Sequence, residues 1–195
     1  MQKRAELGEA MARTYPNGII MAVARDPSGK YNPITLGLFM QTSGDPPMFA
    51  ISVAPERYSF EVIRSSKQFV LSYPSLEMAS DALFHGTHSG RNMDKLAECK
   101  TKTQTARKID CVLLSDAVAN LECELEGELE SGDHVIFLGR VVASHVNEDP
   151  SVKRLYCIGP GYELGGAEPR PIQGCEEAAA APAGRPHRLD HRDQA

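Results

Sequence analysis

Short apolar runs separated by turn-rich breaks dominate the first third of the chain. The runs cover residues 19–24, about 33–40 and 48–53, and the breaks between them contain residues 26–29 and 44–47, which combine proline with glycine. Proline presets φ and glycine accepts positive φ, so these breaks are turns by composition. Breaks this short favour antiparallel strands over strand–helix–strand units.

Small helices are expected between the strands that follow. The predicted elements, in chain order, are a helix at 59–64, a strand at 68–73, a helix from 74 to about 84 and a helix at about 92–98. Ser59 is a suitable N-cap for the first helix. Leu76, Ala79 and Leu83 have the spacing of one helix face, and we expect that face to be buried.

The clearest periodicity lies at residues 121–126, where apolar residues alternate strictly with glutamates. Period two is typical of a half-buried antiparallel strand and not of a helix. Residues 131–134 then turn the chain, and 135–146 form a second long strand, so the two strands predict a hairpin. Together these elements predict a mainly β protein with small helices (α+β), in the form of a Greek-key barrel.

Composition divides the chain into three segments. Residues 1–17 hold a short amphipathic stretch, and residues 18–175 carry the predicted elements of one domain. Residues 176–195 are rich in Ala, Pro, Arg and Asp and contain a single Leu. This last segment has too little apolar surface to offset the entropy of ordering it, so we expect a disordered tail.

The charge balance narrows the classes of partner. The chain has 195 residues, with 21 Lys and Arg against 26 Asp and Glu and a net charge of −5. A net acidic chain without a concentrated basic stretch is a poor ligand for nucleic acid. No apolar run has the length of a membrane span, and the first residues lack the apolar core of a secretory signal. We expect a cytoplasmic protein that binds neither nucleic acid nor membrane.

Cysteine and histidine spacing argues against a metal centre. The five cysteines form no CxxC pair, so neither a disulfide framework nor a zinc knuckle is indicated. His85 and His88 share a polar stretch, but further ligands are missing from its surroundings in the sequence. We therefore expect no metal site.

Two helix entrances are candidates for anion binding. In one, Ser89 and Arg91 precede Lys95 at the start of a predicted helix, whose free N–H groups and dipole suit a phosphate. In the other, Arg57 and Ser59 lie at the start of the helix at 59–64. On pattern alone an ordinary solvated cap explains each segment as well. The glycine patterns of a P-loop and of a dinucleotide-binding Rossmann unit are both missing from the sequence.

Taken in order, six segments resemble the flavin reductase-like, FMN-binding split β-barrel family, the group that includes flavoredoxin. The resemblance extends from about residue 16 to residue 166. The segments are Asn32-Pro33-Ile34-Thr35, Thr42-Ser43-Gly44-Asp45-Pro46-Pro47, Ala54-Pro55-Glu56-Arg57-Tyr58-Ser59, Gly86-Thr87-His88-Ser89-Gly90-Arg91 with Asp94-Lys95-Leu96, Ala119-Asn120-Leu121-Glu122-Cys123, and Gly132-Asp133-His134 with Ile136-Phe137.

The resemblance implies a homodimer with one FMN per subunit, bound near the dimer interface. By similarity, Arg57 and Ser59 line the cofactor site, Lys95 pairs with FMN, and residues 38–43 pass along the flavin ring. The chain contains no Trp, although relatives often place one in that stretch. The full set of expected cofactor-binding residues is Asn32, Thr35, Leu38, Thr42, Ser43, Arg57, Ser59, Ser89, Arg91, Lys95 and His134.

The resemblance leaves more than one function open. The first is an oxidoreductase that passes hydride from NAD(P)H to flavin N5 and electrons onward, to free flavin or to a redox partner protein. The second is an FMN-bound electron carrier or flavin-binding module without NAD(P)H activity of its own. FMN itself carries the redox chemistry, so no catalytic side chain is assigned.

Overall fold

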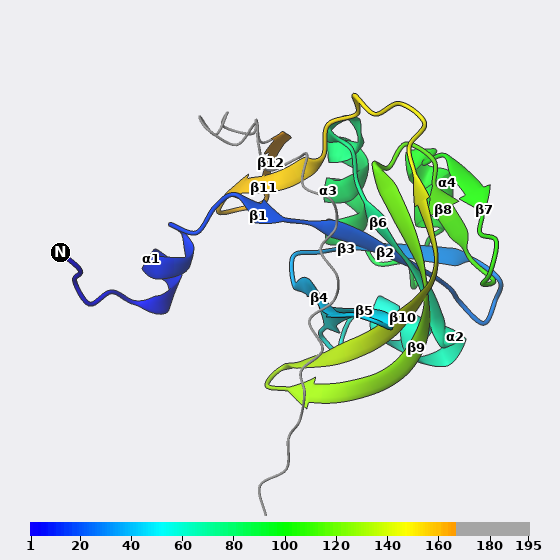
Figure 1. Ribbon diagram of the computed structural model, residues 1–195, viewed down its shortest axis with the longest axis horizontal. Coiled ribbons are helices and arrows are strands. Elements are labelled where there is room, and N and C mark those ends of the chain that lie inside the picture. The colour runs from blue at the N-terminus through cyan, green and yellow to red at the C-terminus, as the bar shows by residue number, and fades with distance from the viewer. Residues whose placement is uncertain (167–195) are drawn as a thin grey trace, which may run out of the picture.

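The protein is an open, curled sheet with small helices around it (Figure 1). A computed structural model describes residues 1–166, and the predicted tail at 176–195 lies outside the described residues. The elements are α1 (Leu7–Met11), β1 (Asn17–Gly18), β2 (Ile20–Arg25), β3 (Tyr31–Leu36), β4 (Phe39–Gly44), β5 (Pro47–Val53), α2 (Tyr58–Ser66), β6 (Gln68–Tyr73), the 3-10 helix η1 (Leu76–Met78), α3 (Ala79–Thr87), α4 (Lys95–Cys99), β7 (Thr103–Thr105), β8 (Val112–Leu114), β9 (Ala119–Ser131), β10 (His134–Val146), β11 (Leu155–Gly159) and β12 (Glu163–Gly166).

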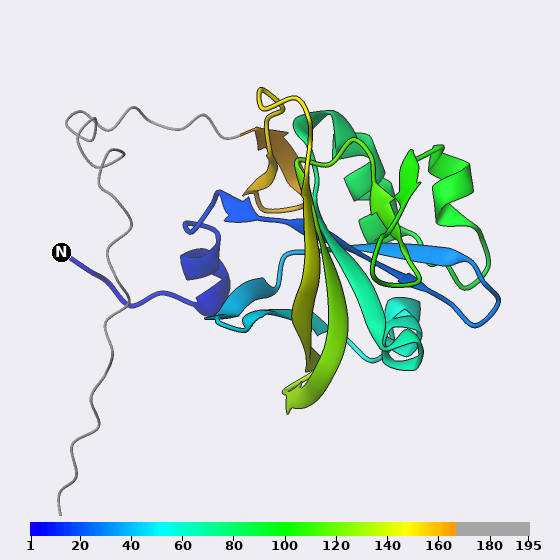
Figure 2. The ribbon, with the colours of Figure 1, turned by 45° about the vertical axis from the view of Figure 1, so that its right-hand side comes forward.

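Seven strands form the main sheet in the order β3-β2-β6-β9-β10-β5-β4, and the strand pairs are antiparallel. The two edge strands, β3 and β4, are consecutive in the chain and are separated only by Gly37 and Leu38. Ser52 N of β5 donates a hydrogen bond to the Leu38 carbonyl at 2.9 Å. The sheet therefore curls until its edges approach each other at this bend (Figures 1 and 2). The predicted fold class, a mainly β split barrel, is confirmed.

Strand β2 explains why its sequence is a continuous apolar run. Ile20 and Ala22 face the core inside the barrel, whereas Met21 and Val23 face a second core on the outside of the sheet. Alternate side chains of a strand point to opposite faces, so a strand that is buried on both faces has apolar residues throughout. The second core is completed by η1, α3, β8 and the residues that follow β7.

A small sheet of order β1-β11-β12 lies beside the barrel. Its β1 comes from the start of the chain and pairs with β11 through Asn17↔Cys157 and Gly18↔Tyr156. In Figure 1 this sheet lies at the upper left, well away from the tip of the β9–β10 hairpin at the lower left. Among residues 1–166 the structure contains no helix long and apolar enough to cross a membrane.

Two predicted elements need correction. The strand expected at about 33–40 is two strands, because the chain bends at Gly37 and Leu38 and continues along the opposite edge of the sheet. The predicted apolar face of the helix expected from 74 to about 84 was also wrong, since Leu76 and Leu83 are exposed. The 3-10 turn of η1 precedes α3 and shifts its register, so that Ala82 is buried instead.

Two predicted helix starts also differ from the structure. Helix α2 begins at Tyr58, so Arg57 is its N-cap and Ser59 lies buried inside its first turn. Helix α4 begins only at Lys95, because Asp94 is its N-cap and the Asp94 carboxylate accepts a hydrogen bond from Ala97 N at 3.1 Å. In both cases the residue before the observed start has the extended backbone that a helix N-cap requires.

Candidate functional site

A cleft of about 1020 Å³ lies between the curled sheet and the small sheet of β1, β11 and β12. Its walls come from β1, from β3 and the bend at Gly37 and Leu38, from the end of β5, from one face of α3 and from the hairpin turn before β10. The lining is more apolar than polar in area, and it includes a few charged side chains. This combination is typical of sites for planar organic cofactors.

Four of the predicted binding residues line the cleft: Thr35, Leu38, Arg57 and His134. The Thr35 hydroxyl donates to the Ala82 carbonyl at 2.7 Å, which fixes β3 against α3. Leu38 is 57% exposed. A large apolar side chain exposed at a cleft is available for an apolar ligand or a partner surface.

His134 and Arg57 place nitrogen groups in the cleft. His134 Nδ1 lies 2.7 Å from Asp133 Oδ1, a contact that orients the ring and leaves Nε2 for a ligand. The hydrogen bond from His134 lowers the pKa of Asp133, which keeps that carboxylate ionised. Within residues 1–166, Arg57 has no carboxylate partner and no side-chain hydrogen bond. Among the described residues Arg57 is therefore a cleft cation outside any ion pair, although the carboxylates of Glu56 and Asp133 also line the cleft.

Asn32 and Ser59 are buried and do not line the cleft, and Asn32 Nδ2 donates to Ser59 Oγ at 2.7 Å. Asn32 Oδ1 is also buried, but it has no hydrogen-bond partner among the described residues. Turning the amide over would leave its nitrogen in that position, so one end of the amide lacks a partner in either assignment. A Cβ at Gly90 would lie 2.0 Å from Asn32 Oδ1, so only glycine allows the backbone to approach this closely.

Lys95 is 2% exposed and does not line the cleft. Its Nζ donates to the carbonyls of His85 at 3.0 Å and His88 at 3.1 Å, at the C-terminal end of α3. Burial lowers the pKa of Lys95 to about 8. In this structure the ammonium therefore caps a helix, and its predicted pairing with FMN remains a prediction.

The other residues of the predicted glycine-loop site are occupied by local contacts. Ser89 Oγ accepts from Arg91 N at 3.3 Å. Arg91 forms an ion pair with Glu61 at 3.1 Å, and its guanidinium lies over the Tyr58 ring at 5.1 Å. The Asp94 carboxylate already accepts a hydrogen bond from one amide at the start of α4, and anion binding at this helix entrance stays a prediction.

Thr42 and Ser43 lie on the edge strand β4, outside the cleft lining. A register shift lies between Gln41 and Ser43 in the pairing of β4 with β5. The structure therefore separates the predicted binding residues into four groups: the cleft wall, the buried side chains, the exposed loop before α4 and the sheet edge. Whether each group binds a cofactor stays a prediction.

Sequence reasoning missed the part of the cleft that comes from the two ends of the described chain. Tyr15 precedes β1, Cys157 lies on β11, and Tyr162 lies in the turn before β12. The glycine-rich run at 159–165 was the only signal there, and its spacing excluded a Rossmann unit without indicating another role. These residues join the cleft through the pairing of β1 with β11.

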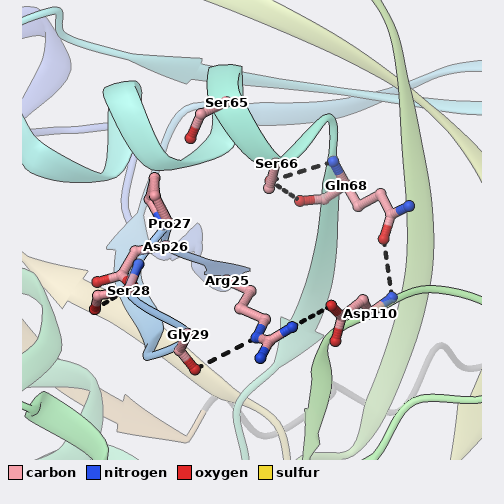
Figure 3. Close-up of a pocket in the computed structure, with 9 residues that line it drawn as sticks. All are labelled: Arg25, Asp26, Pro27, Ser28, Gly29, Ser65, Ser66, Gln68 and Asp110. Carbon is pink, nitrogen blue, oxygen red and sulfur yellow. Dashed lines mark hydrogen bonds and ion pairs between the residues drawn. The ribbon is translucent and has the colours of Figure 1, made fainter.

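A second hollow, of about 530 Å³, lies between the 26–29 turn and the end of α2 (Figure 3). Arg25 forms an ion pair with Asp110 there, and Gln68 Oε1 accepts from Asp110 N at 2.9 Å. Figure 3 shows these groups engaged with one another across the hollow. Its polar groups thus tie the loop before β8 to the ends of β2 and β6, so this hollow is a weaker candidate for a ligand site.

The comparison with protein families decides the assignment. Residues 11–163 match the model described as flavin reductase like domain. This chain belongs to that family. The matched region contains most of the cleft, including its apolar wall, Arg57 and His134.

Curated relatives of this flavin reductase-like protein are identical to it at about a third of the aligned positions or fewer. A protein of Pyrococcus abyssi is 36% identical over 107 residues, which cover 55% of this chain and 61% of the relative. A flavin reductase of Pseudomonas putida is 27% identical over 161 residues, which cover 81% of this chain and 86% of that enzyme. The chain thus spans less than two thirds of the length of the first of these relatives.

Solved structures show the same fold. Flavoredoxin of Desulfovibrio vulgaris (Miyazaki F) superposes with a TM-score of 0.77 at 21% identity, covering 90% of this chain and 100% of its own. An FMN-binding protein of Thermus thermophilus, solved with bound p-hydroxybenzaldehyde, gives 0.74 at 25% identity, covering 85% and 95%. The NADH:FAD oxidoreductase SgcE6 of Streptomyces globisporus C-1027 gives 0.72 at 21% identity, covering 86% and 100%.

Proposed function

We propose that this flavin reductase-like protein binds FMN in the cleft and uses it to oxidise NAD(P)H. The observation that carries the proposal is the cleft itself, in which the unpaired Arg57 and the oriented His134 lie beside an apolar wall. The family assignment supports flavin chemistry at this position. When bound, the flavin supplies a hydride acceptor at N5 and passes electrons onward.

The residues present fit an anionic flavin. A guanidinium outside any ion pair suits a phosphate, and Arg57 provides one at the N-cap of α2. Leu38 and Phe39 provide apolar contact for a ring and exclude water from that side. With Nδ1–H donated to Asp133, His134 Nε2 is an acceptor and can receive a hydrogen bond from a ring N–H. The unpartnered end of the Asn32 amide belongs to β3, which also contributes residues to the cleft wall, and it gains a partner if the site tightens around a ligand.

The alternative is a flavin-bound electron carrier without NAD(P)H activity. Among the structural neighbours, the names of an FMN-binding protein and of an NADH:FAD oxidoreductase reflect both possibilities. We favour the reductase because the cleft, at about 1020 Å³, is at the upper limit of the roughly 300–1,000 Å³ of ordinary ligand pockets, which leaves room for a second molecule beside a flavin ring.

We further propose that the protein acts as a homodimer. The edge strand β4 and the bend before it expose Met40 at 61% and Leu38 at 57%, next to the opening of the cleft. An unpaired sheet edge with exposed apolar side chains is a liability in a monomer, and a second copy covers it. This arrangement would place the partner beside the flavin.

The test of the cofactor site is a flavin titration followed by a turnover assay. FMN fluorescence should be quenched by the wild-type protein, and NADH or NADPH should be oxidised faster than by free FMN alone. Arg57→Gln should weaken FMN binding by about 1–3 kcal/mol, the usual range for a charged hydrogen bond. Arg107→Gln is the matched control, because Arg107 is exposed and lies outside the cleft.

The outcomes separate the two functions. Saturable FMN binding without NAD(P)H oxidation above the free-flavin background supports the electron carrier. If the purified protein neither shows flavin absorption nor quenches added FMN, the proposal is wrong in both forms.

The homodimer is tested by sedimentation velocity on the wild type and on Met40→Asp. The charged side chain should oppose burial of β4 and shift the protein to the monomer. Val146→Asp is the control, since Val146 is 81% exposed at the far end of β10. A wild-type monomer at micromolar concentration would contradict the dimer.

A further inference from the structure

The Arg154 side chain is held between two tyrosine rings next to the small sheet. Its guanidinium carbon lies 4.6 Å from the centre of the Tyr73 ring and 5.0 Å from that of Tyr156. Aromatic faces fix the plane of a guanidinium and leave its N–H edge free. The side chain is therefore ordered without being neutralised.

Arg154 differs in this respect from the comparable arginine of the chain. Arg140 and Arg154 are both half-buried. Arg140 pairs with the carboxylates of Glu124 and Glu126. Arg154 has no carboxylate partner and no side-chain hydrogen bond within the described range 1–166, and its Nε is buried without an acceptor. A partly desolvated charge of this kind is costly unless an anion joins it.

A second unpartnered group lies beside Arg154. Ser75 and Arg154 form an isolated antiparallel bridge, in which directly opposite side chains share one face. Ser75 is 2% exposed, and its hydroxyl has no hydrogen-bond partner among the described residues. Four buried side-chain polar atoms of the described residues lack a partner, and two of them belong to this one bridge.

Gly18 brings this guanidinium next to the cleft. Gly18 lines the cleft, and a Cβ at this position would lie 3.0 Å from Arg154 Nη2 and 3.1 Å from Phe39 Cζ. Because Gly18 has no side chain, nothing of that residue beyond its backbone separates the guanidinium from the cleft. Arg154 does not itself line the cleft, and its guanidinium adjoins the cleft at Gly18, beside Phe39.

We propose that Arg154 forms a phosphoryl-binding subsite at the β1 side of the cleft, with Tyr73 and Tyr156 holding the guanidinium plane. Guanidinium is suited to phosphate because two of its N–H groups match two phosphate oxygens. Two sources supply this chemistry, the phosphate of the flavin and the pyrophosphate of a pyridine dinucleotide. The choice between these sources rests on the proposed function, whereas the subsite itself does not.

The subsite is tested first with inorganic pyrophosphate as the probe. Calorimetric titration of the flavin-free protein compares the wild type with Arg154→Gln, Arg154→Lys and the matched control Arg140→Gln. We expect Arg154→Gln to weaken pyrophosphate binding by about 10- to 100-fold, as for loss of a charged hydrogen bond. Arg154→Lys should weaken it less, since it keeps the charge and loses the planar fork, and Arg140→Gln should leave it unchanged. If Arg154→Gln does not fold, the lysine variant carries the comparison.

A second pair of measurements distinguishes the sources. If the flavin is the source, Arg154→Gln lowers the affinity for FMN and leaves that for riboflavin unchanged. If the dinucleotide is the source, the variant raises KM for NADH and leaves KM for 1-benzyl-1,4-dihydronicotinamide, an uncharged hydride donor, unchanged. The proposal is overturned if neither pyrophosphate binding nor either of these ratios depends on residue 154. A wild type that binds no flavin but binds pyrophosphate through Arg154 refutes the proposed function alone.

Discussion

Two buried polar clusters of this protein differ in how completely their hydrogen bonds are satisfied. In the first, the Glu122 carboxylate is 0% exposed on β9 and accepts hydrogen bonds from three successive backbone amides, those of residues 107–109, at 2.6 to 3.1 Å. His145 Nε2 lies 2.6 Å from the same carboxylate. Every oxygen of the group is used, and the loop before β8 is thereby fixed to the sheet.

The second set of buried polar groups lies on α3, α4 and β3 and is incompletely satisfied. His85 Nε2 contacts Thr101 Oγ1 at 3.0 Å, but His85 Nδ1 is buried without a partner among the described residues. Lys95 Nζ lies on the His85 and His88 carbonyls. One end of the Asn32 amide is unpartnered as well. His85 and Asn32 lie on α3 and β3, and both of these elements also contribute residues to the cleft wall.

This difference in hydrogen bonding separates a cluster that only stabilises the fold, here called a structural joint, from a cluster that adjoins a binding site. A saturated buried carboxylate stabilises one conformation, and its removal leaves several amides without acceptors. A cluster with unused donors or acceptors is less stable than it could be, and such groups accumulate where a ligand or a local rearrangement completes them. The contrast predicts opposite consequences for stability and for ligand binding when each cluster is altered.

The largest effect is expected at the saturated cluster. Glu122→Gln keeps the shape but replaces one acceptor oxygen by an NH₂ group that faces backbone amides. We expect a loss of about 3–5 kcal/mol in the free energy of unfolding, the range for breaking a buried charged network, with flavin affinity unchanged in the variant that remains folded. Urea denaturation followed by circular dichroism measures it.

Glu126→Gln is the matched control for this change. Glu126 lies on the same strand and pairs with Arg140, but its side chain is 44% exposed. Exposed pairs contribute about 0–1 kcal/mol. If the two substitutions had equal effects, the Glu122 cluster would not be the joint described above.

The second effect concerns acid stability and arises from His85. Burial lowers the pKa of His85 to about 4 from its ordinary value of 6.5. Between these values the unfolded chain binds the proton and the folded protein does not, so stability falls as pH drops from 6.5 to about 4. The loss is up to about 3 kcal/mol, since each pKa unit corresponds to about 1.4 kcal/mol.

This loss of stability at acid pH is measured by comparing the unfolding free energies of two proteins across the pH window. His85→Gln removes the titrating ring, so its stability should change less than that of the wild type across the same pH window. His88→Gln is the control, because His88 is exposed and stacks on Phe84. Parallel pH profiles for wild type and His85→Gln would show that His85 is not the group that titrates.

The Glu122 joint also shows what could be predicted from the sequence. The alternation at 121–126 allows one interpretation, and β9 and β10 confirm the predicted hairpin. The same pattern did not predict that Glu122 is buried. Alternation along a strand shows which residues share a face, but it does not show which face is buried. Five glutamates alternate along β9, and only the one that meets three free amides is fully buried.

The candidate site was predictable only in part, because its position depends on contacts between distant segments. Arg57 and His134 line the cleft as expected, since each lies beside a turn whose place in the sheet the pattern predicts. Lys95 does not, because nothing in a helix start shows whether a lysine extends toward solvent or toward the carbonyls of another helix. Cys157 and Tyr162 reach the cleft wall through the pairing of β1 with β11. No local sequence pattern predicts that pairing, so their position could not be predicted.

The smallest effect is expected at the unsaturated cluster, from Gly90→Ala. A Cβ at Gly90 would lie 2.0 Å from Asn32 Oδ1, so Asn32 must shift and its hydrogen bond to Ser59 must weaken. We expect a loss of about 1–3 kcal/mol in unfolding free energy, the usual cost of overpacking, together with weaker FMN binding. Gly44→Ala is the control, since a Cβ there meets nothing within 4 Å. A Gly90→Ala protein as stable as the control but deficient in FMN binding would show that the unpartnered amide serves the ligand alone, whereas a loss of stability without loss of binding would make this cluster a second structural joint.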